Sequence, residues 1–100
     1  MFQTRDGTGV LCIIEGSPYS LGSLVWDVQR ETSDVILSLS ELPDLKDELI
    51  FELHASGTVY TFSLHTTLKF DQGHVELSGR ESSRRDMNRE ERVRYMLHVL

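Results

Sequence analysis

The chain has 100 residues, of which 39% are hydrophobic and 26% charged, and this composition is that of one folded domain rather than of a disordered chain. Its formal charge of −6 argues against a general binder of nucleic acids or anionic membranes, because both need a basic surface. A single cysteine, Cys12, excludes an internal disulfide bond and agrees with a reducing cytoplasm. We expect one domain over residues 1–100, with no signal peptide and no segment near the ~18 apolar residues of a membrane span.

The first forty residues predict three short strands. Residues 10–14 (VLCII) are all apolar, which is typical of a buried strand and makes Cys12 an inert core thiol. Residues 24–28 and 35–39 alternate apolar and polar side chains, as half-buried strands do. Trp26 lies on an apolar strand face, so we expect a core position rather than stacking on a ligand. The acidic segment 41–48 contains Pro43 and is expected to be a solvated loop.

Residues 49–64 (LIFELHASGTVYTFSL) carry the clearest pattern in the chain. Apolar and polar residues alternate on both sides of a short segment that contains Gly57, which predicts a β-hairpin. With Ser56 and Gly57 at the tip, the pairs that face each other are Leu53 with Tyr60, Phe51 with Phe62, and Leu49 with Leu64. All three pairs then lie on one face of the sheet.

The second hairpin strand is expected to continue to Phe70, with a bulge near Thr66 and Thr67, where the alternation breaks. Residues 74–78 alternate again and predict one more strand. Six or seven short strands without a helical pattern among them indicate a small antiparallel β-barrel over residues 8–79. The fold class is therefore mainly β, of the α+β type.

The period changes after Gly79. Residues 80–87 are polar and are expected to be a connector, and residues 88–100 to be a helix with Asn88 as N-cap and Glu91 at the capping-box position. An apolar stripe of helical period follows, formed by Val93, Met96, Leu97 and Leu100. A helix this short is marginal alone, so we expect the stripe to pack against the open end or flank of the barrel, or against a partner chain.

The order of strands, acidic turn, hairpin, strand and closing helix resembles a PilZ-type barrel domain. The resemblance is carried by residues 25–28, 35–39, 49–53, 75–77 and 88–92. The barrel domain that precedes PilZ in flagellar-brake proteins is similar in shape and is a second possible relative. Such domains bind cyclic di-GMP or, in divergent members, dock onto other proteins, so the resemblance implies a bacterial signalling protein.

The nucleotide-binding motifs of that family are not present here. The family has an Arg-x-x-x-Arg before the barrel and an Asp/Asn-x-Ser-x-x-Gly on an early strand. This chain has only Arg5 in its lead-in, and residues 27–32 (DVQRET) lack the serine and the glycine. The resemblance therefore implies a degenerate member that does not bind cyclic di-GMP.

Two Arg-x-x-x-Arg patterns follow the predicted barrel instead, Arg80 with Arg84 and Arg85 with Arg89. Guanidinium groups bind phosphates through paired hydrogen bonds, so these four residues are candidate ligands of cyclic di-GMP in an alternative interpretation. A merely solvated surface is the other interpretation of this segment.

No catalytic motif is present. The residues His54, His65, His74 and His98 lack metal-ligand spacing, and His65 is expected to pair with Glu48 on the surface. We therefore expect no catalytic residue, no metal and no cofactor.

The sequence favours a non-catalytic protein-interaction or adaptor domain of the cytoplasm, whose partner is another protein and whose partner-binding residues are Val93, Met96, Leu97 and Leu100. Two alternatives remain open. One is a cyclic-di-GMP receptor that uses the arginine-rich tail, and the other is a structural protein that self-associates through its helix.

Overall fold

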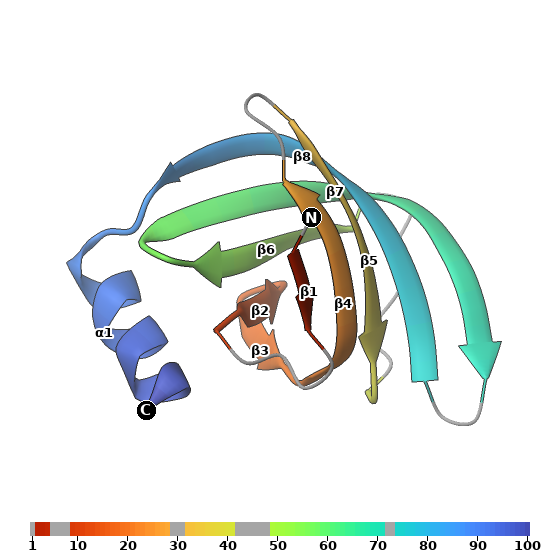
Figure 1. The fold of residues 1–100 in the computed structure, drawn as a ribbon, viewed down its shortest axis with the longest axis horizontal. Coiled ribbons are helices and arrows are strands. Elements are labelled where there is room, and N and C mark those ends of the chain that lie inside the picture. Colours follow the sequence, from red (N-terminus) through yellow and green to blue (C-terminus); the bar gives the residue numbers. More distant parts are fainter. Residues whose placement is uncertain (1, 5–8, 29–31, 42–48, 72–73) are drawn as a thin grey trace.

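The computed structural model describes the backbone of residues 2–4, 9–28, 32–41, 49–71 and 74–100, and the side chains of residues 9–28, 32–41, 49–64 and 75–100. Within these residues the chain forms one eight-stranded antiparallel sheet and one helix (Figure 1). The elements are β1 (Phe2–Thr4), β2 (Leu11–Ile14), β3 (Ser17–Tyr19), β4 (Leu21–Val28), β5 (Ser33–Leu39), β6 (Ile50–Ala55), β7 (Thr58–Asp71), β8 (His74–Asp86) and α1 (Arg89–Val99).

The sheet curls into a half-barrel with the strand order β1-β4-β5-β8-β7-β6-β2-β3 (Figure 1). The prediction of a mainly antiparallel β fold with a C-terminal helix is confirmed. The described residues form eight strands where the sequence predicts six or seven, because β1 and β3, of three residues each, are too short to produce a visible alternation. These two short strands form the edges of the sheet.

The hairpin of β6 and β7 has the register that the sequence predicts. Phe51 pairs with Phe62 and Leu53 with Tyr60, and the amide of Leu64 donates to the carbonyl of Leu49 at 2.9 Å. Ser56 and Gly57 form the tip with φ angles of 52° and 86°, the left-handed conformations that a two-residue type I′ turn needs. Alternation and turn chemistry therefore specify the same register.

The two long strands, β7 and β8, bend to make the curl (Figure 1). Their pairing shifts register at three places, two of which lie between Leu64 and Thr66 and between Thr67 and Lys69. These shifts confirm the bulge expected near Thr66 and Thr67. Extra residues on one strand bend it and increase its twist, so the bulges let the sheet wrap around a core.

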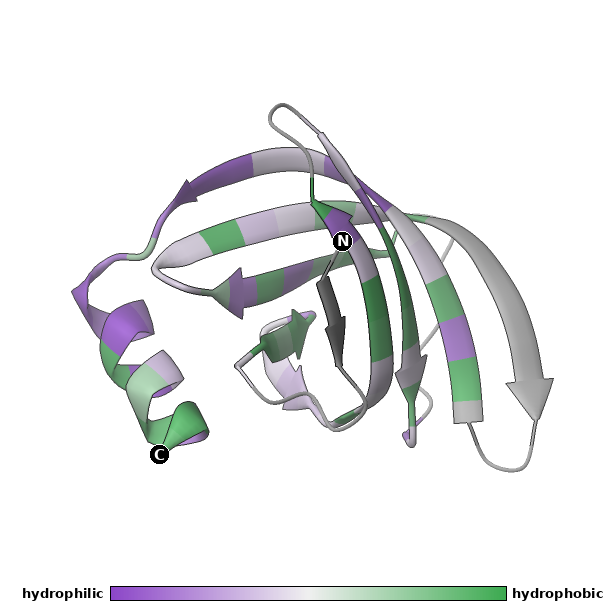
Figure 2. Cartoon of the chain, viewed as in Figure 1, coloured by the Kyte–Doolittle hydropathy of each residue, from purple (hydrophilic) through white to green (hydrophobic). Residues whose placement is uncertain are grey.

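One apolar cluster fills the inner face of the half-barrel. Its largest side chains include Trp26, Phe51 and Phe62, and Cys12 is buried among them. Phe51 and Phe62 are stacked with ring centroids 5.3 Å apart, and Trp26 meets Phe62 edge to face at 5.9 Å. The predicted core positions of Trp26 and Cys12 are therefore confirmed. Figure 2 shows the corresponding bands of hydrophobic and hydrophilic residues along the strands.

The prediction of a polar connector at residues 80–87 is wrong, since β8 continues through Asp86 and pairs with β7 along its whole length. The alternation of apolar and polar residues does not continue along this part of the strand, because two of its inward side chains, Glu81 and Arg84, are charged. They neutralise each other, with both guanidinium contacts at 2.6 Å. A bulge at Ser82 brings both side chains to the inner face, although they are three residues apart.

The buried carboxylate of Glu81 is part of a polar network at the rim of the half-barrel. Ser33 donates to it at 2.7 Å, and the indole of Trp26 donates to the hydroxyl of Ser33 at 3.0 Å. The guanidinium of Arg84 lies 5.0 Å from the centroid of the Tyr60 ring. Because every one of these polar groups has a partner, the network closes this end of the core without an unpaired charge.

Several predicted features lie outside the described residues. They are the pairing of His65 with Glu48, the side chain of His74, and most of the acidic loop at 41–48.

Candidate functional site on the C-terminal helix

Helix α1 begins with the capping box that the sequence predicts. The amide of Glu91 donates to Asn88 Oδ1, and the amide of Asn88 donates to Glu91 Oε1, each at 2.9 Å. Asn88 has extended backbone angles, as an N-cap residue does. This arrangement fixes the start of the helix at Arg89, with two residues between it and the end of β8.

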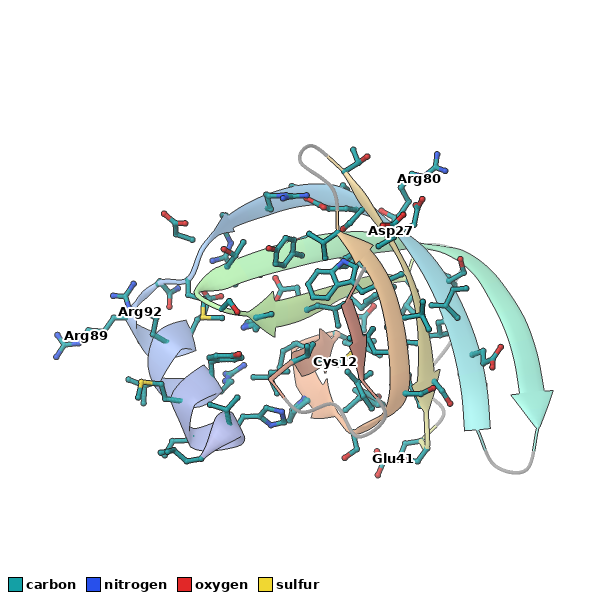
Figure 3. All side chains as sticks on the ribbon, in the orientation of Figure 1. Cys12, Asp27, Glu41, Arg80, Arg89 and Arg92 are labelled. Carbon is teal, nitrogen blue, oxygen red and sulfur yellow. The ribbon has the colours of Figure 1, made fainter. Side chains whose placement is uncertain are left out.

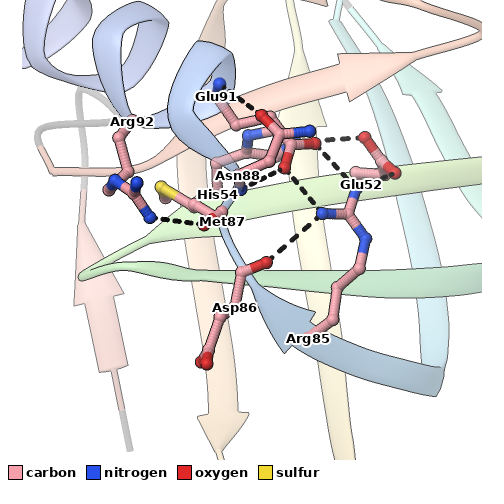
Figure 4. Close-up of polar contacts among 8 residues, drawn as sticks. All are labelled: Glu52, His54, Arg85, Asp86, Met87, Asn88, Glu91 and Arg92. Carbon is pink, nitrogen blue, oxygen red and sulfur yellow. Dashed lines mark hydrogen bonds and ion pairs between the residues drawn. The ribbon is translucent and has the colours of Figure 1, made fainter.

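A second interaction joins the helix to the sheet at the same place (Figure 4). Arg85 donates to both carboxylate oxygens of Glu91, at 2.6 and 2.7 Å, and also lies 3.9 Å from the carboxylate of Glu52. These bonds are the main reason that the pKa of Glu91 falls from 4.5 to about 2. The strand β8, the helix and β6 are therefore tied together by one guanidinium group.

His54 lies beneath this junction and is 1% exposed. Its Nε2 lies 3.0 Å from Glu52 Oε1; because a carboxylate oxygen accepts, the ring donates this hydrogen bond through Nε2–H, while Nδ1 has no partner within the described residues. The apolar side chains of Leu11, Val59 and Met87 are also buried but do not belong to the main core cluster.

Two side chains farther along the helix attach it to the other end of the chain. The hydroxyl of Tyr95 donates to the carbonyl of Gly9 at 2.6 Å and accepts from the amide of Ser56 at 3.3 Å. His98 Nε2 lies 3.0 Å from the carbonyl of Val10. Glu91, Tyr95 and His98 are spaced at i, i+4 and i+7, so the helix is attached to the sheet by one face and through polar groups.

The apolar stripe lies on the opposite face of the helix and is open to solvent. The exposed fractions of Val93, Met96, Leu97 and Leu100 are 55, 58, 71 and 92%. The expectation that this stripe packs on the barrel is therefore wrong, because the polar face makes the contacts with the sheet. None of the described residues of α1 is itself buried.

The four candidate arginines do not form one phosphate site. Arg84 points to the inner face and is bound to Glu81, whereas Arg85 points to the outer face and is bound to Glu91. Arg80 pairs with Asp34 at 3.2 Å, and Arg89 extends from the start of the helix, far from Arg80 (Figure 3). No two of these side chains share a carboxylate partner or a hollow within the described residues.

Glu52, His54 and Glu91 bring one potential metal-ligand atom each to within 4.8 Å of one another. Two features of the group oppose a metal ion. Arg85 already occupies the carboxylates as their counter-ion. In addition, a histidine that ligates through Nε2 normally donates its Nδ1 proton to an acceptor, and Nδ1 of His54 has none here. The group is better explained as the polar attachment of the helix.

The two described hollows on the surface are shallow. One, of about 300 Å³, crosses the outer face of β4, β5 and β8 between Val25, Ile36 and Arg80. The other, of about 400 Å³, lies between Ile13, Glu15 and Ile50. The first is also lined by the hydroxyl of Ser78 and the carboxylates of Asp27 and Asp34, and Asp34 pairs with Arg80 at 3.2 Å.

Sequence reasoning found the stripe and the capping box but missed the residues that attach the helix. Tyr95 and His98 contact backbone carbonyls of residues that lie more than eighty positions earlier in the sequence. The only available signal was their spacing on the face opposite the stripe, and it does not identify their partners.

The comparisons with known proteins found no matching family model, no matching curated protein and no matching solved structure. Among the residues described, no helix has both the length and the apolar character needed to cross a membrane.

Proposed function

We propose that this chain is a non-catalytic protein-interaction domain of the cytoplasm, and that it binds its partner through the apolar stripe of α1. One observation carries the proposal: the helix is attached to the sheet by its polar face and exposes its apolar face to solvent. An amphipathic helix of a monomeric domain normally does the reverse. A contiguous exposed apolar surface of this kind marks an interaction site in many proteins.

The attachment of the helix supports the proposal. The capping box, the bonds between Arg85 and Glu91 and the anchor at Tyr95 hold α1 in one position on the sheet. A partner therefore meets a helix that is already ordered, and binding costs less conformational entropy than the folding of a free segment would. The same bonds keep the stripe directed away from the sheet.

To test the proposal, the purified chain and its Leu97→Lys variant are immobilised and exposed to native lysate of the source organism. We expect the parent chain to capture a defined protein and the variant to lose it. Ile36→Lys is the matched control, because Ile36 is an exposed apolar residue of β5. No described hydrogen bond or ion pair joins β5 to the helix. Equal capture by the parent chain and Leu97→Lys would contradict the proposal.

The resemblance to PilZ domains leads to a second part of the proposal, namely that the chain does not bind cyclic di-GMP. The absent nucleotide motifs support it, as does the engagement of Arg84 and Arg85 with carboxylates. Calorimetry with cyclic di-GMP is expected to show no binding in the micromolar range. Saturable binding that disappears in an Arg85→Ala/Arg89→Ala double variant would support a second-messenger receptor instead.

A further inference from the structure

The apolar stripe has a charged border, and the border is mostly basic. Arg92 and Arg94 lie on its two sides, and Arg89 precedes Val93 by one turn in line with the stripe. Glu90, on the same side as Arg94, is the one acidic residue among them. The other acid of the helix, Glu91, lies on the attached face and is already paired with Arg85.

Two of the border arginines form no ion pair among the described residues, although Glu90 lies one turn before Arg94. Arg89 and Arg94 are exposed, and neither forms an ion pair or a hydrogen bond with another described side chain. Arg92 donates to the carbonyl of Met87 at 2.8 Å, which positions its guanidinium without neutralising it. The border of the stripe is thus mostly cationic, with Glu90 as its acid, on a protein whose formal charge is −6.

We propose that the partner bound by α1 is an amphipathic helix of another protein whose apolar seam is bordered by acidic residues. This inference rests on the proposed function and specifies its partner class. A stripe at i, i+3, i+4 and i+7 is the width of a seam between two paired helices. Charges beside such a seam select the partner, and arginines select glutamates or aspartates.

A second copy of this chain fits the border less well. Antiparallel pairing centred between Met96 and Leu97 places Arg94 of one copy opposite Val99 of the other. Glu90 then lies about nine residues, or roughly 13 Å, along the axis from Arg94 of the other copy, beyond ion-pair reach. Parallel pairing brings the same arginines together. In both arrangements the border arginines of one copy have no row of acidic residues opposite them on the other copy.

An anionic membrane would supply negative charge to the arginines, but the remainder of the molecule opposes it. Helices that lie on membranes have a polar face rich in Lys and Arg, whereas the polar face of α1 is bound to the rest of the chain through Glu91, Tyr95 and His98. The net negative charge of the whole protein would be held against an anionic surface. Neither objection applies to a helix of another protein.

The test uses the full chain, labelled with ¹⁵N, and two synthetic helical peptides of about three heptads. Both peptides have leucine at the seam positions; one has glutamate at all bordering positions and the other has lysine. We expect saturable shifts of the amides of residues 92–100 with the glutamate peptide, and affinity lower by about fivefold or more with the lysine peptide. Leu97→Lys is expected to abolish binding of the glutamate peptide.

Reversal of the border charges provides the decisive control. In Arg89→Glu/Arg94→Glu the apolar stripe is intact, so we expect the preference to reverse in favour of the lysine peptide. Equal affinity for the two peptides, or an unchanged preference in the reversed variant, would overturn the inference. Formation of a dimer in light scattering, or binding to vesicles of phosphatidylserine and phosphatidylcholine that Leu97→Lys abolishes, would assign the stripe to those occupants and also overturn it.

Different results contradict the two claims, namely that the stripe binds the partner and that the partner has an acidic border. If capture from lysate depends on Leu97 but the two peptides bind equally, only the acidic partner class is wrong. If capture does not depend on Leu97, the use of the stripe is itself wrong.

Discussion

Gly79 is the position where β8 approaches the aromatic core most closely. It pairs with Val35 and faces inward, beneath the stacked rings of Phe51 and Phe62. A Cβ atom at this position would lie 2.5 Å from Phe51 Cζ and 3.3 Å from Phe62 Cβ. Only a residue without a side chain fits there, since packed cores leave little room for rings to move.

We therefore predict that Gly79→Ala destabilises the protein by about 1–3 kcal/mol, the usual cost of overpacking a core. Urea unfolding followed by tryptophan fluorescence measures the change through Trp26. Ser78→Ala, one residue away on the outer face, is expected to change the free energy of unfolding by less than about 0.5 kcal/mol. Similar stabilities of the two variants would show that Phe51 is free to move.

Cys12 is a second residue whose behaviour follows from its surroundings. Burial raises the pKa of its thiol to about 12, so the reactive thiolate is scarce at neutral pH. We predict that a chromogenic disulfide reagent at pH 8 modifies Cys12 only as fast as the protein unfolds, and at once in urea. Rapid modification without denaturant would place the thiol at the surface.

At the scale of the element, α1 shows how a helix is held by polar contacts. The start of the helix could be predicted, because Asn88 and Glu91 form a local pattern whose partners are each other. Its attached face could not, because Tyr95 and His98 bind backbone groups of the first ten residues. The general rule that apolar faces are buried predicts that the stripe packs on the barrel or on a partner chain, and packing on the barrel is wrong because the stripe is exposed.

The bonds between Arg85 and Glu91 lead to a prediction for acid unfolding. Because the pKa of Glu91 is lower in the folded protein, the unfolded chain takes up the proton first as the pH falls. The stabilisation from Glu91 is complete above about pH 4.5 and is lost as the pH falls toward 2. We predict that the difference in unfolding free energy between the parent chain and Glu91→Gln is largest above pH 4.5 and shrinks toward pH 2.

The matched control is Glu90→Gln, since Glu90 is exposed on the same turn and makes no described ion pair. Its difference from the parent chain is expected to stay small across this range. A Glu91→Gln difference that is constant between pH 6 and pH 2.5 would contradict the assigned role of Arg85.

At the scale of the whole molecule, period-two patterning predicted most of the sheet. It identified the hairpin register from Leu53 with Tyr60 and the core position of Trp26, while the wholly apolar run at residues 10–14 identified the core position of Cys12. The pattern failed where inward side chains are charged, as at Glu81 and Arg84. In the sequence, two charged residues that form a buried ion pair look the same as two charged residues in a solvated segment. Pair partners forty or more residues apart, such as Ser33 and Glu81, become visible only in the fold.

In the proposed function, the half-barrel serves as a support and the helix as the element that presents the binding surface. The sheet contains the apolar core, and the junction at Arg85 and Tyr95 fixes α1 beside it. The proposed interaction surface is therefore separate from the groups that stabilise the fold. Substitutions on the stripe are expected to change binding without unfolding the chain.

The stability of a Leu97→Lys/Leu100→Lys variant tests this separation most directly, with urea unfolding as the measurement and Leu53→Ala as the buried reference. Leu53 is fully buried, so its truncation is expected to cost about 2–5 kcal/mol. For the lysine variant we predict a change within about 0.5 kcal/mol per substitution, because both leucines are exposed. A loss as large as that of Leu53→Ala would mean that the stripe is packed against the sheet, and would contradict the account.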